Sequence, residues 1–269
     1  MSQEHEGPGT DRRQFLRRTA ASGAGMVVGA SALEVLVPSF AAAKSGGVSK
    51  GDVAIVAAAQ IAEALAVTTY TNIINNAPFF KRLPSDDQGY LVAARQEEMS
   101  HYALEMSVTG KPSPFTTFYY PPKMFSNAQT TLDVLVTLED AFIAAYLVGV
   151  RYFSTPDLRV LAARIMGIES DHRTLARVLG GDVASRDGGP ITKITGVQGT
   201  DEPADPPNNN GYERTLRWTN ISQAVTALTP FADKTAAAKA GFDTSKAYEF
   251  KPFTPHLPEA LGAFHSFLG

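Results

Sequence analysis

Cysteine is absent from the 269 residues of this chain, and histidine is scarce, with five residues. The absence of cysteine excludes disulfides, iron–sulfur clusters and thiolate metal sites, so any bound metal must be held by carboxylates and imidazoles. Neither sign of charge is in large excess, because 24 Lys and Arg face 27 Asp and Glu for a net charge of −3. This balance provides no basic surface for nucleic acid, and no nucleic-acid partner is expected.

What is present is ordinary for a globular protein, with 44% hydrophobic and 19% charged residues.

The first 43 residues are expected to be an export signal outside the fold. Segment 12–16, Arg-Arg-Gln-Phe-Leu, precedes a mildly apolar stretch at 20–37, and small residues follow at 41–43. This order is typical of a signal peptide with a small-residue cleavage site, and the apolar stretch is too short for a membrane anchor.

The Arg-Arg-x-Phe-Leu core at 12–16 resembles the twin-arginine export signal. That resemblance implies that the protein folds in the cytoplasm, commonly with its cofactor bound, and is then exported to the periplasm or another extracytoplasmic space. No transmembrane anchor is expected after cleavage.

Four segments after the signal carry apolar residues at the helical period, and each sets a carboxylate into its apolar stripe. The fourth is expected to begin at Pro156, because proline suits the first turn of a helix, and to end at the glycine pair 180–181. The four predicted helices cover 52–76, 85–109, 128–153 and 156–181.

The connections between these segments predict the topology. Short loops join the first helix to the second and the third to the fourth, so each pair is expected to form an antiparallel hairpin. Residues 110–127, rich in proline and aromatics, are long enough at up to ~3.3 Å per residue to run the ~36 Å length of a helix. One long crossover between helices 2 and 3 predicts an all-α four-helix bundle over 50–182.

The apolar stripes also carry a repeated pattern of metal-ligating residues. Each hairpin has a lone Glu on its first helix and a Glu-x-x-His motif on its second, and the spacing of three lets both motif side chains reach one metal. A single Glu-x-x-His motif usually lies on a solvated helix face. Two copies that face one core would bury several unpaired carboxylates, which costs too much free energy unless a metal is bound. The predicted ligands are Glu63, Glu98, His101, Glu139, Glu169 and His172.

Four carboxylates carry a charge that two divalent cations would neutralise. Carboxylate oxygens with one imidazole per ion suit iron first and manganese next, and zinc could also bind.

This set of residues resembles the metal site of the ferritin-like superfamily, which includes ferritins, bacterioferritins, rubrerythrins and exported ferritin-like domains found beside desiccation-related proteins. The resemblance covers about 52–181, roughly half of the chain. It implies terminal ligands at Glu63 and Glu139, bridging ligands at Glu98 and Glu169, and nitrogen ligands at His101 and His172.

Several neighbours have two interpretations each. Tyr70 and Tyr146 lie two turns after the lone Glu of their helices, where they would either hydrogen-bond a ligand and pass an electron or simply fill the core. Glu105 would be either an additional carboxylate near the site or a partly exposed residue at the bundle end. Glu97 and Asp140 lie off the stripes and are expected in solvent.

Residues 183–269 are expected to be an irregular extension with one short helix at about 219–233. Aromatic residues and prolines alternate over 248–269, which favours packing against the bundle or a partner. His256 and His265 have no ligand partners at useful spacing and are interpreted as surface or packing residues.

The pattern favours a dinuclear iron or manganese oxidoreductase that acts on Fe(II) and dioxygen or on a peroxide, as a ferroxidase, peroxidase or catalase would. The alternative is a non-enzymatic envelope or stress-related protein that binds metal or stores iron. Against a storage cage, about 87 residues follow the bundle. Metal identity, substrate, cleavage point and any homo-oligomer stay open at this level.

Overall fold

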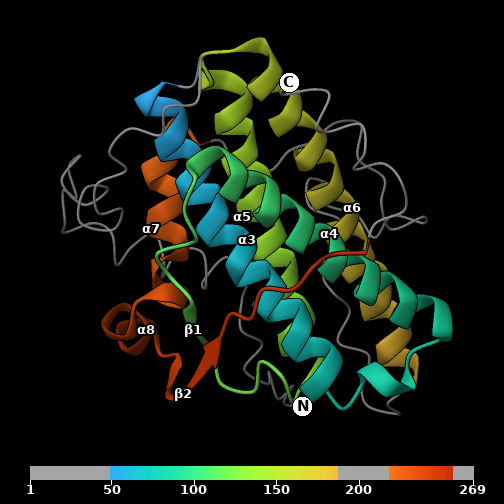
Figure 1. The fold of residues 1–269 in the computed structure, drawn as a ribbon. Coiled ribbons are helices and arrows are strands. Elements are labelled where there is room, and N and C mark those ends of the chain that lie inside the picture. Colours follow the sequence, from blue (N-terminus) through green and yellow to red (C-terminus); the bar gives the residue numbers. More distant parts are fainter. Residues whose placement is uncertain (1–48, 187–217, 257–269) are drawn as a thin grey trace, which may run out of the picture.

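Four long helices form the bundle, in the computed structural model that describes residues 49–186 and 218–256 (Figure 1). The predicted export signal at 1–43 lies outside the described residues. Helices α3 and α4 make one hairpin, and α5 and α6 make the other, which confirms the all-α bundle with a long crossover. The bounds are α3 Lys50–Asn76, α4 Ser85–Thr109, α5 Ala128–Tyr152 and α6 Pro156–Arg186.

Local sequence signals fix most of the helix ends. Asn127 caps α5, accepting a hydrogen bond from the Thr130 amide at 2.9 Å. Thr155 caps α6 by accepting one from the Leu158 amide at 3.3 Å, and Pro156 is the first helical residue, as expected. Gly110 ends α4 in the left-handed conformation, with φ of 67°.

The predicted end of the fourth helix at the glycine pair 180–181 is wrong, because α6 continues to Arg186. Glycine in a helix interior costs only about 1 kcal/mol relative to alanine, and the next proline is Pro190. A glycine pair therefore weakens a helix without having to end it.

The crossover and the C-terminal region pair with each other, which the sequence did not indicate. Strand β1 Thr117–Tyr120 lies in the crossover and pairs antiparallel with β2 Asp243–Glu249, with Phe118 opposite Tyr248. Such pairing joins residues far apart in sequence, so no local pattern reports it.

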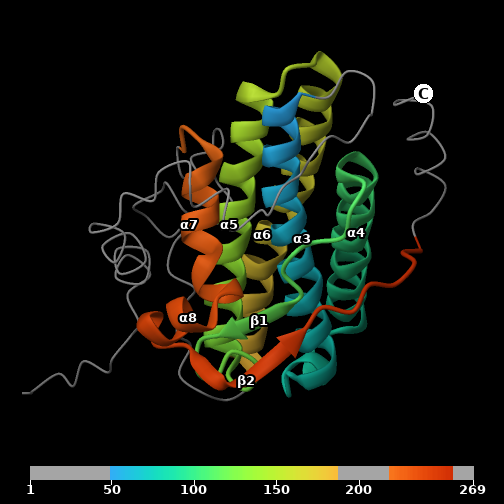
Figure 2. The ribbon, with the colours of Figure 1, turned by 60° about the vertical axis from the view of Figure 1, so that its left-hand side comes forward.

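Helix α7, Ile221–Ala232, confirms the short helix expected at 219–233, and α8, Lys234–Ala240, was not predicted. Figures 1 and 2 place α7 alongside α5 on the outside of the bundle, and α7 contacts α3 as well. The described part of the C-terminal region thus packs on the bundle, as its aromatic residues suggested.

Aromatic rings fasten this region to the bundle. The Tyr120 ring of β1 lies 5.9 Å from Phe231 of α7 and 5.2 Å from Tyr248 of β2. Phe250 packs against Tyr102 of α4 at 4.7 Å. Aromatic pairs of this kind add to the stabilisation from buried area, so α7 and β2 belong to the same core as the four long helices.

Among the described residues, α3 is the one helix long and apolar enough to cross a membrane by length and composition. In the bundle, 83% of its most apolar window is buried inside the protein. Its apolarity is that of a helix packed on several sides.

Asp52 ties the start of α3 to the α5–α6 loop. It is 1% exposed, accepts hydrogen bonds from the Ser49 amide at 2.9 Å and the Ser154 amide at 2.8 Å, and also bonds the Ser154 hydroxyl. Burial alone would raise the pKa of Asp52, but the bonds from Ser154 and Ser49 hold this pKa below its ordinary value.

Asp52→Ala is expected to lower the free energy of unfolding by about 2 kcal/mol at pH 7, because it removes the carboxylate half of the capping box at the start of α3 and the hydrogen bonds to Ser154. Because the folded pKa is depressed, this contribution is present above the ordinary pKa of Asp and is lost as pH falls through the folded value. Urea unfolding at pH 7 and pH 3 measures both effects. Asp86→Ala, in the exposed first turn of α4, is the control, and equal losses in the two variants would contradict the prediction.

Candidate metal centre

The six predicted ligands meet in the middle of the bundle, each from the helix expected. Helix α3 contributes one carboxylate and α5 another, while α4 and α6 each contribute a carboxylate and an imidazole one turn later. All four carboxylates are at most 1% exposed, and the two histidines are 9% and 4% exposed. The cluster comprises Glu63, Glu98, His101, Glu139, Glu169 and His172.

These side chains form two overlapping groups, and in each group four potential ligand atoms lie within 4.8 Å of one another. Both groups contain Glu98 and Glu169. The first adds Glu63 and His101, and the second adds Glu139 and His172. Two neighbouring cation positions that share two carboxylates are therefore compatible with the geometry.

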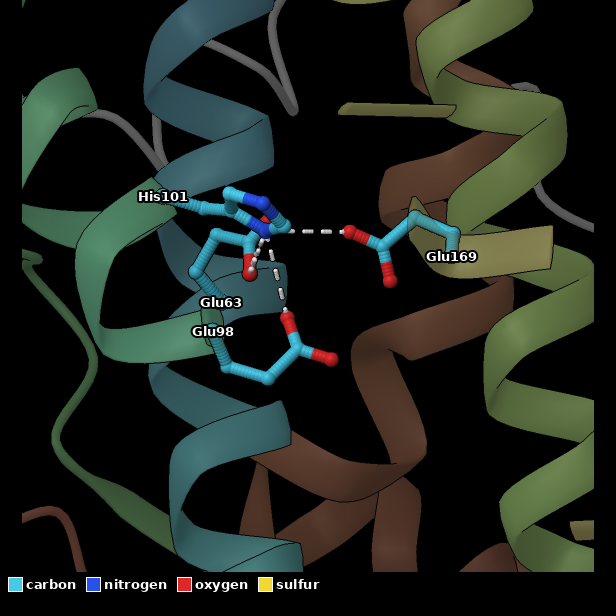
Figure 3. A group of neighbouring side chains, drawn as sticks. All are labelled: Glu63, Glu98, His101 and Glu169. Carbon is cyan, nitrogen blue, oxygen red and sulfur yellow. Dashed lines mark ion pairs between the residues drawn. The ribbon is translucent and has the colours of Figure 1, made fainter. Parts of the chain in front are cut away.

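Each histidine directs its Nδ1 atom at the shared carboxylates. Nδ1 of His101 lies 3.2 Å from Glu169, 3.5 Å from Glu98 and 3.6 Å from Glu63 (Figure 3). Nδ1 of His172 lies 2.8 Å from Glu98 and 3.7 Å from Glu169. An imidazole nitrogen placed among carboxylate oxygens is the donor set of a carboxylate-rich metal site.

Many of the inward-facing atoms lack a hydrogen-bond partner among the described residues, although they are buried. Burying such polar atoms is costly unless something compensates them, and a bound cation does so. The residues present therefore fit a divalent metal. The atoms without a hydrogen bond include Oε2 of Glu63, Glu98 and Glu139, both oxygens of Glu169, and Nδ1 of His101.

A family model described as a ferritin-like domain matches residues 51–181. Together with the bundle topology, this match shows a ferritin-like fold over these residues. The match contains all six predicted ligands, in agreement with the bundle topology. No curated protein and no solved structure matches the chain significantly.

Buried carboxylates of the cluster have shifted pKa values. Burial, together with the charges of Glu98 and Glu169, raises the pKa of Glu63 and of Glu139 well above the ordinary value. Burial would also raise the pKa of Glu98, but His172 and His101 hold it well below its usual range.

Both histidines are biased toward the charged form. Burial would lower the pKa of each, but the neighbouring carboxylates, Glu63 for His101 and Glu98 for His172, raise both values well above the ordinary one. Charged imidazoles among carboxylates partly offset the negative charge of the cluster.

The two tyrosines contact the ligands rather than only filling the core. Tyr70 of α3 donates a hydrogen bond to Glu139 of α5 at 2.7 Å. In return, Tyr146 of α5 bonds Glu63 of α3. This exchange across α3 and α5 follows from the equal spacing of seven between the lone Glu and the Tyr on each helix, and it orients both lone carboxylates.

Glu105 and Glu97 both contact the site. Glu105 is only 4% exposed and its Oε1 lies 2.8 Å from the Tyr146 hydroxyl, so the partly exposed alternative is wrong. The expectation that Glu97 lies in solvent is correct only in part, because its side chain is 37% exposed but its Oε2 lies 2.8 Å from Nε2 of His172. This contact crosses from α4 to α6, so spacing along one helix could not indicate it.

The prediction for Asp140 is wrong. Predicted in solvent, it is 1% exposed and pairs with Arg173 of α6 at 2.9 Å. Because Asp140 follows Glu139 and Arg173 follows His172, this buried pair holds α5 and α6 together beside the cluster. The apolar stripe of one helix does not indicate that a charged residue beside it is buried by pairing with a charge on another helix.

Proposed function

We propose that the ferritin-like domain binds two divalent metal ions, with iron preferred and manganese next, and acts as an oxidoreductase on Fe(II) and dioxygen or on a peroxide. The observation that carries this proposal is the pair of four-residue groups that share Glu98 and Glu169. Shared carboxylates would keep two ions adjacent, and an adjacent redox pair supplies two electrons to an O–O bond.

Under this proposal the residues divide into three roles. Glu63 and His101 would hold one ion, and Glu139 and His172 the other, while the shared pair, Glu98 and Glu169, would contact both. Hard oxygen ligands with one nitrogen per ion support iron or manganese.

The surrounding residues would preserve the orientation of the ligands. Tyr70 and Tyr146 hold the lone carboxylates by hydrogen bonds, and Glu97 holds Nε2 of His172 so that Nδ1 faces the cluster. Partners of this kind fix the rotamers of ligands and tune their basicity. The tyrosines are also the nearest candidates for electron donors.

Export is part of the proposal, because the Arg-Arg-Gln-Phe-Leu segment at 12–16 would carry a folded, metal-loaded protein to the periplasm or another extracytoplasmic space. The alternative function, a non-enzymatic envelope or stress-related protein that binds or stores metal, uses the same ligands. It predicts metal binding without turnover.

Turnover by the purified full chain tests the oxidoreductase. Anaerobic protein is loaded with Fe(II) or Mn(II), and oxidation of Fe(II) or loss of peroxide is followed after mixing with dioxygen or hydrogen peroxide. We expect catalytic oxidation that Glu169→Ala reduces at least about 100-fold, because it removes a carboxylate shared by both groups.

Asp171→Ala, an exposed carboxylate two residues further along α6, is the matched control and should retain the wild-type rate. Stoichiometric metal with no turnover on any of these oxidants would favour the non-enzymatic alternative. Turnover equal in both variants would contradict the proposed site.

A further inference from the structure

An apolar pocket lies at the end of the bundle where α3 and α6 begin and α4 and α5 end. Its cavity volume is about 20 Å³, which is enough for one small molecule. Side chains from all four helices line it, and Ile221 at the start of α7 joins them, so the C-terminal region contributes to this pocket.

The pocket is adjacent to the metal-ligand cluster on three of the four helices. Ala59 precedes Glu63 by four residues on α3, and Ile165 precedes Glu169 by four on α6. On α4, which runs the opposite way, Glu105 follows His101 by four. Four residues are one helical turn, a rise of about 6 Å, so a guest here would lie one turn from the cluster.

Glu105 and Tyr146 are the only polar side chains among the lining residues. The Tyr146 hydroxyl already contacts Glu63 and Oε1 of Glu105, while Oε2 of Glu105 has no hydrogen-bond partner among the described residues. Water normally needs two to four polar partners in a buried site, so a lining this apolar does not stabilise it. Hydrogen peroxide, with two donors and several lone pairs, would be similarly under-satisfied.

Small side chains maintain the space. A Cβ atom added to Gly149 would lie 2.8 Å from a ring carbon of Phe153 and 3.3 Å from the Cβ of Ala162. Glycine at 149 therefore lets the Phe153 ring pack at the wall, and Ala162 leaves room beside it.

We infer that this pocket binds a small, uncharged, apolar molecule and that, resting on the proposed function, this molecule is dioxygen approaching the metal site. The pocket's apolar lining, its size and its distance of one turn from Glu63 and Glu169 carry the inference. Tyr146 and Glu105 form the layer between the guest and the cluster.

Xenon tests the binding site without metal or turnover. Xenon under pressure is applied to crystals of the metal-free full chain, and we expect it between Ala59, Ala162 and Ile165. Ala162→Leu should remove this xenon because the longer side chain fills the space, whereas Ala93→Leu, at an exposed position on α4, should retain it. An empty pocket in the wild-type crystals would overturn the inference.

Should Ala162→Leu fail to fold, Val108→Phe fills the pocket from α4 and takes its place, with thermal unfolding as the check. Persistence of xenon at the same position in a folded filling variant would also overturn the site.

Oxidant dependence tests the identity of the guest. In the iron-loaded protein, Ala162→Leu should slow the reaction at low dioxygen by about tenfold and change the rate with hydrogen peroxide less than about twofold. Equal slowing with both oxidants would overturn the assignment to dioxygen. Xenon binding in a protein without turnover would instead reject the proposed function and leave the pocket as an apolar binding site.

Discussion

Glu98→Ala is expected to reduce the bound metal from two ions per chain to none. Glu98 belongs to both four-residue groups, is fully buried, and lies within 2.8 Å of Nδ1 of His172 and 3.5 Å of Nδ1 of His101. Its loss leaves three ligands at each position and removes one of four negative charges, so neither cation would be adequately compensated.

Glu139→Ala provides the matched comparison, because Glu139 belongs to only one of the two groups. We expect this variant to retain about one ion, held by Glu63, His101 and the shared carboxylates. Metal analysis of protein purified with excess Fe(II) or Mn(II) gives the stoichiometry directly. Asp171→Ala, an exposed carboxylate on α6, should retain two ions.

Equal metal content in Glu98→Ala and Glu139→Ala would contradict the shared-ligand arrangement. Circular dichroism checks that both variants keep their helices, so that a loss of metal is not a loss of fold. Wild-type protein with no stoichiometric metal would contradict the proposed function as well.

Metal loading is expected to raise the Tm by roughly 8–16 °C at pH 7.5. Metal bound to the folded state alone stabilises it by about 4 kcal/mol at a thousand times Kd. For a protein of this size each kcal/mol shifts Tm by about 2–4 °C. Thermal unfolding with metal and with a chelator measures the difference.

The Tm of the metal-free protein and the increase in Tm caused by metal are expected to change in opposite directions with pH. In the metal-free protein, burial raises the pKa of Glu63, Glu139 and Glu105, and the pKa values of His101 and His172 are raised by the carboxylates around them despite burial. Groups with raised pKa hold more protons in the folded state, so their contribution to stability falls as pH rises from 5.5 to 7.5. The depressed pKa of Glu98 acts below this window.

Metal binding requires deprotonated ligands, so its stabilising effect grows over the same pH range. The Tm of the metal-free protein should therefore fall between pH 5.5 and pH 7.5, while the increment from metal should rise. Glu98→Ala, expected to bind no metal, should show no increment at either pH. Parallel Tm curves for the loaded and metal-free wild type would contradict proton displacement by metal.

The sequence predicted the six ligands of this site but not all of the contacts around them. The six ligands could be predicted because each lies on the apolar stripe of one of the four helices. Residues at the helical period share one face of their helix, so their spacing in the sequence shows which of them face the core. Tyr70 and Tyr146 could be nominated for the same reason, but their exchange of partners between α3 and α5 required the packed helices.

Two contacts between helices could not be predicted from the helical period. Glu97 and Asp140 lie off the stripes of their own helices, yet each meets a charged or basic partner on α6. The β1–β2 pair also depended on contacts that no local pattern contains. Helix α6 continued through 180–181 because a glycine pair weakens a helix without having to end it.

By itself, the sequence determined the number and order of the bundle helices, the long crossover and the six potential ligands, because helical period and loop length are local properties. The resemblance to ferritin-like sites also implied that Glu98 and Glu169 are shared, which agrees with the two ligand groups of the structure. The tertiary structure alone decided which side chains hold the ligands in place and where an apolar pocket adjoins them. Those features are distances between helices, and they exist only after the hydrophobic faces of α3, α4, α5 and α6 have packed together.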